Sequence, residues 1–243
     1  IYIGTSNVVV PGNKTSFPAA YQSKSRLHYY STLFNTVEIN SSFYKTPLFT
    51  TYEKWTQEVP DDFRFSIKLT RDITHAKDLK GDWTHFEKFM RTAAGTGDKK
   101  GCLLVQFPGK ITLDYFSRVE EILERLTDRA PEEQWPLAVE FRHPGWYVGE
   151  TVELLDECGA ALVLHDMPKS KIWEARTKAP FVYLRFHGEK GDYKESYSPS
   201  FLKEKATEIR GWQKKGKDVY VYFNNTIGEA FENARSLKAM LER

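Results

Sequence analysis

The fold is decided by the stretch Pro136-Leu-Ala-Val-Glu-Phe-Arg-His-Pro-Gly-Trp-Tyr147. It begins as an apolar strand, becomes charged at every second residue and breaks at a Pro-Gly pair. Because residues two apart in a strand share a face, Glu140 and Arg142 point to one side of it. Val139 and Phe141 point to the other side. The stretch therefore predicts a strand with one apolar face and one face that is charged near its C-terminal end.

Strands of this kind alternate with helices along the whole chain. Besides the opening stretch, strands are expected at residues 2–5, 37–40, 64–69, 101–107, 160–166, 181–188 and 218–225. Helices are expected at residues 23–34, 84–92, 114–128, 149–158, 198–215 and 228–242, with another that begins near Pro47. The segments 6–22, 70–82 and 167–180 are expected to be irregular.

Eight strands that alternate with helices predict an α/β fold with a parallel sheet. At this length the units fit one domain over residues 1–243, a single (β/α)8 barrel of the TIM type. An open doubly wound sheet is the alternative. That fold usually has a glycine-rich phosphate loop after its first strand, and Gly4-Thr5-Ser6-Asn7 does not match the pattern.

The bulk composition limits the possible partners and the location. The formal net charge is only +2, which gives no electrostatic reason to expect nucleic acid as the main partner. No apolar run approaches the length that crosses a bilayer, so no membrane partner is expected. Cys102 and Cys158 form neither a disulfide framework nor a metal spacing. Since no signal-peptide pattern opens the sequence, we expect reduced thiols and a cytoplasmic protein.

Polar side chains gather on one face of the predicted strands, towards their C-terminal ends. They are Glu38, Asn40, Lys68, Gln106, Glu140, Arg142, Asp166, Arg185, His187, Tyr222 and Asn224. Closing the sheet directs this set into the barrel and the apolar set towards the helices. The C-terminal end of the barrel is where enzymes of this fold keep their active sites. A purely structural network of ion pairs is the alternative, but each unpaired buried charge costs several kcal/mol.

The mixture of acids and bases in this set is typical of proton-transfer chemistry, because opposite charges at close quarters separate pKa values. The candidate catalytic residues are Glu38, Lys68, Glu140, Asp166 and His187. Glu140 or Asp166 is the expected general base, and Lys68 or His187 the expected proton donor.

The remaining members of the set suit the binding of a small polar ligand. Arg142 and Arg185 are expected to hold a carboxylate or phosphate through paired hydrogen bonds. The side-chain amides of Asn40, Gln106 and Asn224 and the phenol of Tyr222 suit hydroxyl-rich ligands. Trp146 offers a stacking face. The candidate substrate-binding residues are Asn40, His75, Gln106, Arg142, Trp146, Arg185, Tyr222 and Asn224.

A divalent metal ion is a more specific alternative for the ligand of the same site. Glu38, Glu140, Asp166 and His187 carry the carboxylate and imidazole groups that bind Mg²⁺, Mn²⁺ or Zn²⁺. However, no paired-histidine spacing supports a metal, and three nearby cations argue against one. No cofactor is therefore predicted.

Six motifs together resemble the family called domain of unknown function 72. They are Phe34-Asn-Thr-Val-Glu-Ile-Asn-Ser-Ser-Phe-Tyr44, Ile73-Thr-His75, Leu104-Val-Gln-Phe-Pro108, Val139-Glu-Phe-Arg142, Tyr183-Leu-Arg-Phe-His-Gly188 and Tyr222-Phe-Asn-Asn225. The resemblance spans essentially the whole chain and implies a TIM-type barrel related to sugar isomerases. One departure is Asn7-Val-Val-Val, which stands where family members often continue Gly-Thr-Ser-Gly-Trp.

The family motifs fall on the inward-facing positions and add His75 to them. Together these observations predict an enzyme that performs isomerase-like acid–base chemistry on a small anionic or carbohydrate-like molecule. A metal-dependent hydrolase or nuclease on the same scaffold is one alternative. A non-catalytic protein that binds an anion is another.

Overall fold

The computed structural model describes residues 1–130 and 133–242, and its strands run parallel to one another. They are β1 (Tyr2–Thr5), β2 (Thr36–Ile39), β3 (Arg64–Lys68), β4 (Lys100–Phe107), β5 (Leu137–Phe141), β6 (Ala161–Leu162), β7 (Leu164–His165), β8 (Phe181–Phe186) and β9 (Asp218–Phe223). They pair in the orders β1-β9-β8-β7 and β2-β3-β4-β5-β6. Only Val163 separates β6 from β7, so these two short strands take the place of the single strand predicted over 160–166.

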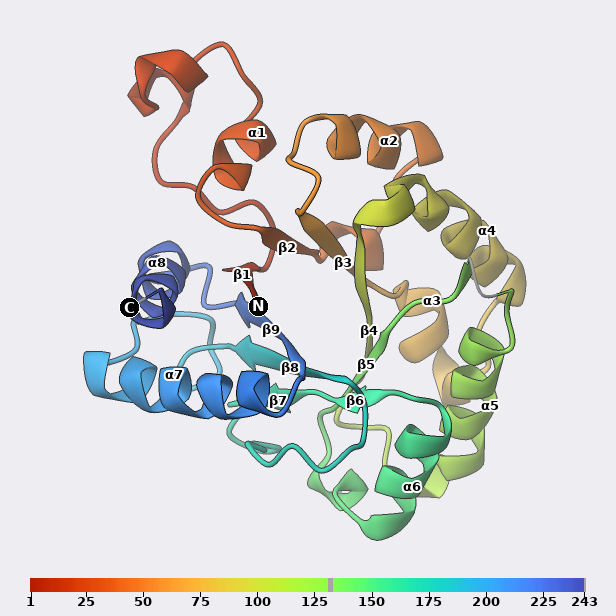
Figure 1. The fold of residues 1–243 in the computed structure, drawn as a ribbon. Coiled ribbons are helices and arrows are strands. Elements are labelled where there is room, and N and C mark those ends of the chain that lie inside the picture. Colours follow the sequence, from red (N-terminus) through yellow and green to blue (C-terminus); the bar gives the residue numbers. More distant parts are fainter. Residues whose placement is uncertain (131–132, 243) are drawn as a thin grey trace.

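The two sheets join into the ring visible in Figure 1. The sheets meet where β1 approaches β2. There Ser6 forms a parallel bridge with Glu38, and the amide of Asn7 donates to the carbonyl oxygen of Glu38 at 2.7 Å. Gly4 allows β1 to approach β2 this closely, because a Cβ atom there would overlap the carbonyl oxygen of Thr36. The strand order is that of a (β/α)8 barrel, as predicted from the sequence.

Helices lie outside the ring of strands (Figure 1). They are α1 (Arg26–Ser31), α2 (Phe49–Gln57), α3 (Arg71–Thr74), α4 (Trp83–Ala93), α5 (Phe116–Thr127), α6 (Gly149–Glu157), α7 (Pro199–Lys214) and α8 (Ala230–Leu241). The segment between β7 and β8 is irregular, as predicted. The prediction was wrong in two details, since α1 is shorter than residues 23–34 and the supposed loop 70–82 contains α3.

Local hydrogen bonds explain both differences. The Ser25 hydroxyl accepts from the amide of His28 at 2.9 Å and caps α1, which therefore begins at Arg26. Thr70 caps α3 in the same way by accepting from the amide of Asp72. Caps of this kind depend on the backbone conformation of one residue, which hydrophobic periodicity does not report.

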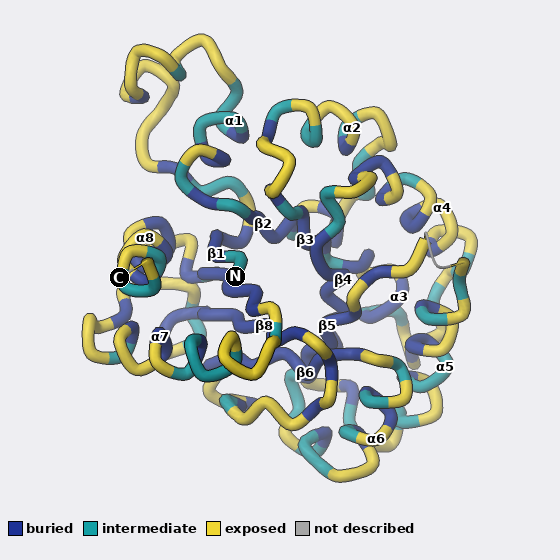
Figure 2. The backbone as a smooth tube through the Cα atoms, in the orientation of Figure 1, coloured by how far each residue is buried: buried dark blue, intermediate teal, exposed yellow. Residues whose placement is uncertain are grey.

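The alternation of side chains along each strand produces two separate apolar layers. On β8, Val182 and Leu184 belong to the layer between the strands and the helices, whereas Tyr183 belongs to a smaller cluster inside the ring. The inner cluster consists of Cys102, Leu104, Ala138, Ala161, Val163, Ala179, Phe181, Tyr183, Tyr220 and Tyr222. Figure 2 shows that the strands are buried and that the helices expose their outer faces. The apolar floor formed by the inner cluster supports the polar residues nearer the C-terminal ends.

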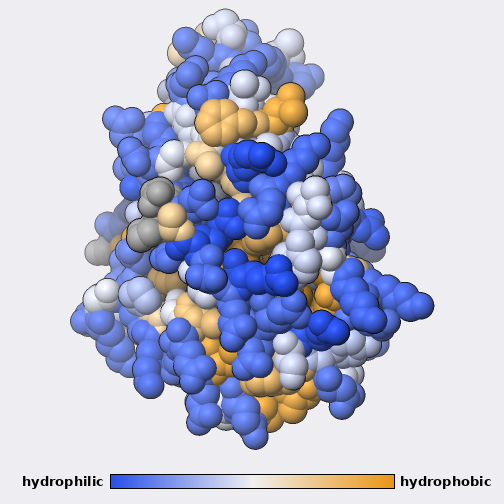
Figure 3. All heavy atoms as spheres, turned by 90° about the vertical axis from the view of Figure 1, so that its right-hand side faces the viewer, coloured by the Kyte–Doolittle hydropathy of each residue, from blue (hydrophilic) through white to orange (hydrophobic). Residues whose placement is uncertain are grey.

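The outer surface is mostly polar. On the face shown in Figure 3, hydrophilic residues predominate and apolar ones form small patches. Within residues 1–130 and 133–242, no helix has both the length and the apolar character that crossing a membrane requires.

Candidate functional site

A cavity of about 420 Å³ opens at the C-terminal ends of the strands, and we refer to it as the mouth cavity. Its lining residues are Asn7, Asn40, Phe43, Tyr44, Lys68, Gln106, Pro108, Gly109, Arg142, Arg185, Tyr193 and Asn224. This set contains three cationic side chains and four amides but no carboxylate. Six of the predicted site residues meet here: Asn40, Lys68, Gln106, Arg142, Arg185 and Asn224.

Glu38 and Glu140 lie behind this lining and are fully buried. Arg185 donates through Nε and Nη2 to the two oxygens of Glu38 at 2.9 and 2.8 Å, and through Nη1 to Glu140 at 2.8 Å. Ser6 and Tyr183 donate their hydroxyls to Glu38 at 2.6 and 2.7 Å. One guanidinium group therefore links two carboxylates in the interior of the barrel.

Glu140 also accepts a hydrogen bond from Nε of Arg142. Burial alone would raise the pKa of Glu140, but Arg142 and Arg185 hold it well below the usual value. Since both of its oxygens accept from guanidinium groups, Glu140 has little capacity to take a further proton. This placement does not favour the role of general base that the sequence suggested for it.

His187 connects the arginine network to Asp166. Nη2 of Arg142 lies 3.0 Å from Nε2 of His187, and Nδ1 of His187 lies 3.1 Å from the Asp166 carboxylate. An arginine only donates, so Nε2 is the acceptor and Nδ1 carries the proton that is donated to Asp166. Burial, together with Arg185 and Arg142, lowers the pKa of His187 well below its usual value, so the ring is neutral.

Asp166 is almost fully buried beside this histidine. It accepts from the backbone amide of His187 at 2.7 Å and from the hydroxyl of Tyr197. Burial raises the pKa of Asp166 to about 6, although both hydrogen bonds oppose the rise. Asp166 and His187 therefore form an acid–imidazole pair of the kind that serves as a general base in enzymes.

Lys68 differs from the arginines because it has no acidic partner. Its Nζ donates to Oε1 of Gln106 at 2.7 Å and lies 4.1 Å from the centre of the Phe43 ring. Within the described ranges, no carboxylate lies at ion-pair distance from it. Burial, followed by the positive charge of Arg185, lowers the pKa of Lys68 to about 8. Roughly a tenth of this lysine is therefore neutral at pH 7.

His75 is half-buried at the side of the mouth cavity, with the centre of its ring 4.7 Å from the centre of the Phe43 ring. Burial and the nearby Lys68 lower its pKa to about 4. It does not line the mouth cavity. Asn40 lines the cavity and has a buried Oδ1 atom without a hydrogen-bond partner.

Two predicted binding residues lie elsewhere, and the structure corrects their assignment. Trp146 is fully buried, donates Nε1 to the carbonyl oxygen of Ile111 at 2.7 Å and stacks on Phe141 at 4.4 Å. The Pro-Gly turn after β5 folds the indole onto the outer face of that strand, so no stacking surface reaches the cavity. Tyr222 faces inward but lies in the floor, where its hydroxyl contacts Thr36 at 2.6 Å.

The sequence prediction missed His165, which faces inward from β7. Leu162 and Leu164 belong to the outer layer, so alternation places Asp166 with them and His165 on the opposite face. His165 lies 6.0 Å from His187, ring centre to ring centre, and burial lowers its pKa to about 4. The two-residue alternation of a strand, started from Leu162 and Leu164, would have placed His165 on the inner face.

Tyr193 and Tyr197 were also missed, and no local signal marked them. They lie in the segment after β8, where the backbone adopts positive φ at Gly188, Gly191 and Tyr193. Hydrogen bonds hold Tyr193 in place, from its amide to the carbonyl oxygen of His187 at 2.8 Å and from the amide of Ile227 to its own carbonyl oxygen at 3.0 Å. The contact with Ile227 depends on how the loop after β8 meets the loop after β9, which no local pattern in the sequence indicates.

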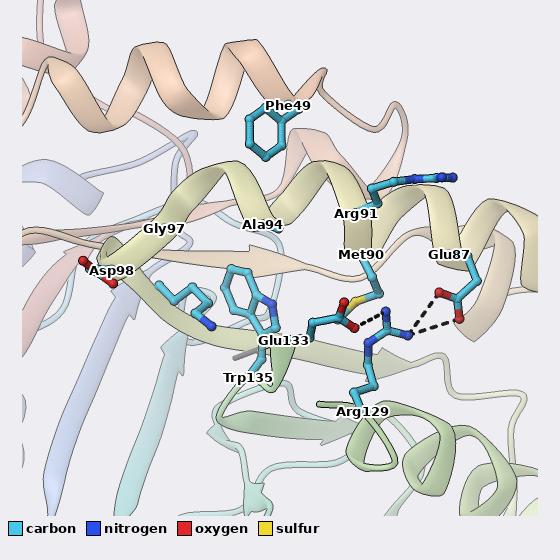
Figure 4. A pocket seen from close by; sticks show the side chains of 11 residues that line it. Phe49, Glu87, Met90, Arg91, Ala94, Gly97, Asp98, Arg129, Glu133 and Trp135 are labelled. Atoms are coloured by element: carbon cyan, nitrogen blue, oxygen red, sulfur yellow. Dashed lines mark hydrogen bonds and ion pairs between the residues drawn. The ribbon is translucent and has the colours of Figure 1, made fainter. Parts of the chain in front are cut away.

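A second cavity of about 550 Å³, shown in Figure 4, contains none of the predicted site residues. Arg129 lies in its wall and forms ion pairs with Glu87 at 3.1 Å and with Glu133 at 2.8 Å. The acids paired with Arg129 lie in the cavity wall itself, whereas the acids paired with Arg142 and Arg185 are buried behind the lining of the mouth cavity.

The predicted metal alternative finds no preformed ligand cluster. In the part of the chain that the structure describes, no three His, Cys, Asp or Glu side chains are grouped so that they could hold a metal ion. Glu38 and Glu140 accept from arginines, and Asp166 accepts from Tyr197 and His187.

Comparison with known proteins gives consistent results. A family model described as "Protein of unknown function DUF72" matches residues 2–243. The UPF0759 protein YunF of Bacillus subtilis (strain 168) is 27% identical and is aligned over 100% of this chain and 95% of its own length. Solved DUF72 family proteins of Enterococcus faecalis V583 and Thermotoga maritima MSB8 superpose with TM-scores of 0.80 and 0.75 at 20% and 26% identity. These alignments cover 100% of this chain and 95% and 99% of theirs.

A more distant structural likeness concerns an enzyme. A D-psicose 3-epimerase crystallised in the presence of D-fructose superposes with a TM-score of 0.60 at 10% identity, over 98% of this chain and 97% of that one. At this identity the likeness supports the barrel fold alone.

Proposed function

The chain belongs to the DUF72 family, and on that premise we propose that it is an enzyme that transfers protons on a small anionic, carbohydrate-like molecule bound in the mouth cavity. The observation that supports this most strongly is the lining of three cations and four amides without an acid. Such a lining attracts an anionic group, and the amides suit ligand hydroxyls. The reaction class is isomerase-like.

Arg142 is the residue that we expect to bind the anionic group. Its Nε and Nη2 atoms are held by Glu140 and His187, while Nη1 makes no hydrogen bond within the described residues. Glu140 and His187 thus orient a guanidinium group whose free edge belongs to the cavity. Arg185 also lines the cavity and adds positive charge to it, but its nitrogens donate hydrogen bonds to Glu38 and Glu140.

Lys68 and His187 are the proposed proton donor and acceptor. Lys68 reaches the cavity directly, and its lowered pKa suits proton donation to a carbonyl oxygen near neutral pH. His187 has its Nδ1 proton directed to Asp166, so Nε2 is its basic atom. That atom becomes available when Arg142 turns from the histidine towards a bound anion, which also relieves the positive charge that lowers the histidine pKa.

The carbohydrate-like character of the ligand is supported by the amides and by the barrel that this chain shares with the D-psicose 3-epimerase. The proposed chemistry needs no cofactor. Nucleic acid and membranes are not part of the proposal. A cytoplasmic location completes it, in line with the free thiols of Cys102 and Cys158.

The first test is a thermal-shift comparison of galacturonate, glucose 6-phosphate and neutral galactose. A ligand that binds the native state raises the melting temperature, so we expect the two anions to stabilise the protein and galactose to have little effect. Arg142→Met should abolish the shift, whereas Arg118→Met on the exposed face of α5 should retain it. Equal stabilisation by galactose, or an unchanged shift in Arg142→Met, would contradict the proposal.

Proton transfer is tested separately by incubating each stabilising anion with the protein in D2O. Loss of the NMR signal of the hydrogen next to the carbonyl group would establish exchange, and His187→Gln should suppress it. Binding without exchange would instead support the non-catalytic anion-binding protein. Exchange or hydrolysis that required added Mn²⁺ would support the metal-dependent alternative.

A further inference from the structure

Lys68 is a partly buried lysine that makes no ion pair with a carboxylate among residues 1–130 and 133–242. Lys205 provides the contrast, since its Nζ lies 2.8 Å from Glu208 and 3.4 Å from Glu204. Lys68 contacts an amide oxygen and an aromatic ring instead. A carboxylate partner would favour the ammonium form of a lysine, so its absence favours the neutral amine.

Burial is the largest influence on the charge of Lys68, and two arginines act in the same direction. Arg185 and Arg142 line the same cavity and add positive charge near its Nζ, whereas the buried Glu140 and Glu38 oppose them. The net result is a pKa of about 8 for Lys68. A desolvated lysine beside other cations is a common form of nucleophilic amine in enzymes, because only the neutral amine has a lone pair to donate.

Gln106 orients this amine within the cavity. Its Oε1 accepts one N–H of Lys68 at 2.7 Å, and the ring of Phe43 lies on another side of the nitrogen. Both residues line the cavity, as does Arg142. A ligand whose anionic group binds Arg142 would therefore have the rest of its structure in the space that Lys68 faces.

We propose that Lys68 forms an imine with a small anionic aldehyde or ketone, such as a 2-oxo acid or an oxidised sugar acid. This inference rests on the proposed function, because it uses the same cavity and the same anion-binding arginine. It goes further by giving Lys68 a covalent role in place of proton donation, with His187 kept as the proton acceptor, and by defining the substrate as a carbonyl compound.

The proposed step begins with attack of the neutral Lys68 amine on the carbonyl group. The lone pair of Nζ bonds to the carbonyl carbon, the nitrogen loses one proton and the carbonyl oxygen gains one, which gives a carbinolamine. The hydroxyl group takes a second proton and leaves as water while the C=N bond forms. The product is a protonated imine, which attracts electrons from the neighbouring C–H bond and makes that hydrogen easier for His187 to remove.

The experiment is reductive trapping with pyruvate and sodium cyanoborohydride, followed by peptide mass mapping. We expect a saturable adduct on Lys68. At pH 7 an amine with a pKa of about 8 has on the order of 100-fold more neutral form than an ordinary lysine, so Lys68 should react far faster than exposed Lys88. Acetate, an anion without a reactive carbonyl, should slow trapping at Lys68 and leave Lys88 unchanged.

Two results would overturn the inference, and they differ in what they say about the proposed function. Trapping at Lys68 no faster than at Lys88, together with a melting-temperature shift by pyruvate, would remove the imine and leave anion binding intact. The absence of both trapping and any shift by the tested anions would remove both proposals. Lys68→Arg, which keeps the charge and cannot form the imine, should retain the shift and lose the adduct.

Discussion

Replacing Lys68 with Met should stabilise the protein at neutral pH. The folded state lowers the pKa of this lysine from 10.5 to about 8, which means that it disfavours the ammonium form. A difference of about 2.5 pKa units corresponds to roughly 3 kcal/mol of unfavourable free energy at pH 7. Met has a similar length and removes the charge.

The substitution also removes two favourable contacts, the hydrogen bond to Gln106 and the approach to the Phe43 ring. Together these contribute about 1–2 kcal/mol. The net expectation is a gain of about 1–2 kcal/mol in the free energy of unfolding at pH 7. For a chain of this size that corresponds to a rise of roughly 2–8 °C in melting temperature.

The pH dependence gives the sharper check. Between pH 8 and 10.5 the unfolded chain keeps the Lys68 proton that the folded state releases, so the stability of the original protein rises with pH in this window. The advantage of Lys68→Met should therefore shrink above pH 8 and disappear near pH 10. Denaturant unfolding at several pH values measures it, with Lys68→Arg and Lys88→Met as controls that should show no such gain.

Either of two results would refute the reasoning. One is a Lys68→Met protein that is less stable than the original at pH 7. The other is a stability difference that stays constant from pH 7 to pH 10, because the effect would then not arise from the charge of Lys68.

Other substitutions test the rest of the structure. Arg185→Met leaves Glu38 and Glu140 without their shared cation and should cost about 3–5 kcal/mol in urea unfolding, and a loss below 1 kcal/mol would contradict the buried network. Asp166→Asn removes a carboxyl whose pKa is raised from 3.8 to about 6 in the folded state. Ionisation of this carboxyl lowers the stability of the original protein as the pH rises from about 4 to about 6. The variant should therefore gain up to about 3 kcal/mol relative to the original between pH 4 and pH 7, and unfolding curves with a constant difference would reject the shift. Gly4→Ala places a Cβ atom against a backbone carbonyl of β2 and should cost about 1–3 kcal/mol by thermal unfolding, whereas a neutral effect would mean that β1 and β2 do not meet this closely.

Much of the candidate site could be predicted from alternation along single strands. Lys68, Gln106 and Arg185 were placed at the mouth cavity because side-chain direction in a strand repeats every two residues. The same alternation was not applied to His165. Leu162 and Leu164 lie in the outer layer and Val163 in the inner cluster, so the two-residue period continues across the gap between β6 and β7 and places His165 inside the ring.

The chemical character of the cavity depended on contacts between distant parts of the chain. Glu38 and Arg185 are 147 positions apart, and no local spacing indicates that they bind each other. The same holds for the Tyr197 hydroxyl on Asp166 and for the packing of Trp146 on Phe141.

Local patterns along the chain were enough to predict a ring of parallel strands with an apolar outer face and a polar inner end, because hydrophobic periodicity and strand geometry are local properties. Tertiary structure alone decided which polar atoms remain available. In the folded chain the buried carboxylates accept hydrogen bonds from arginines, while Lys68 and one edge of Arg142 face the cavity. The reason is physical: a buried charge must find its partner wherever the folded chain provides one.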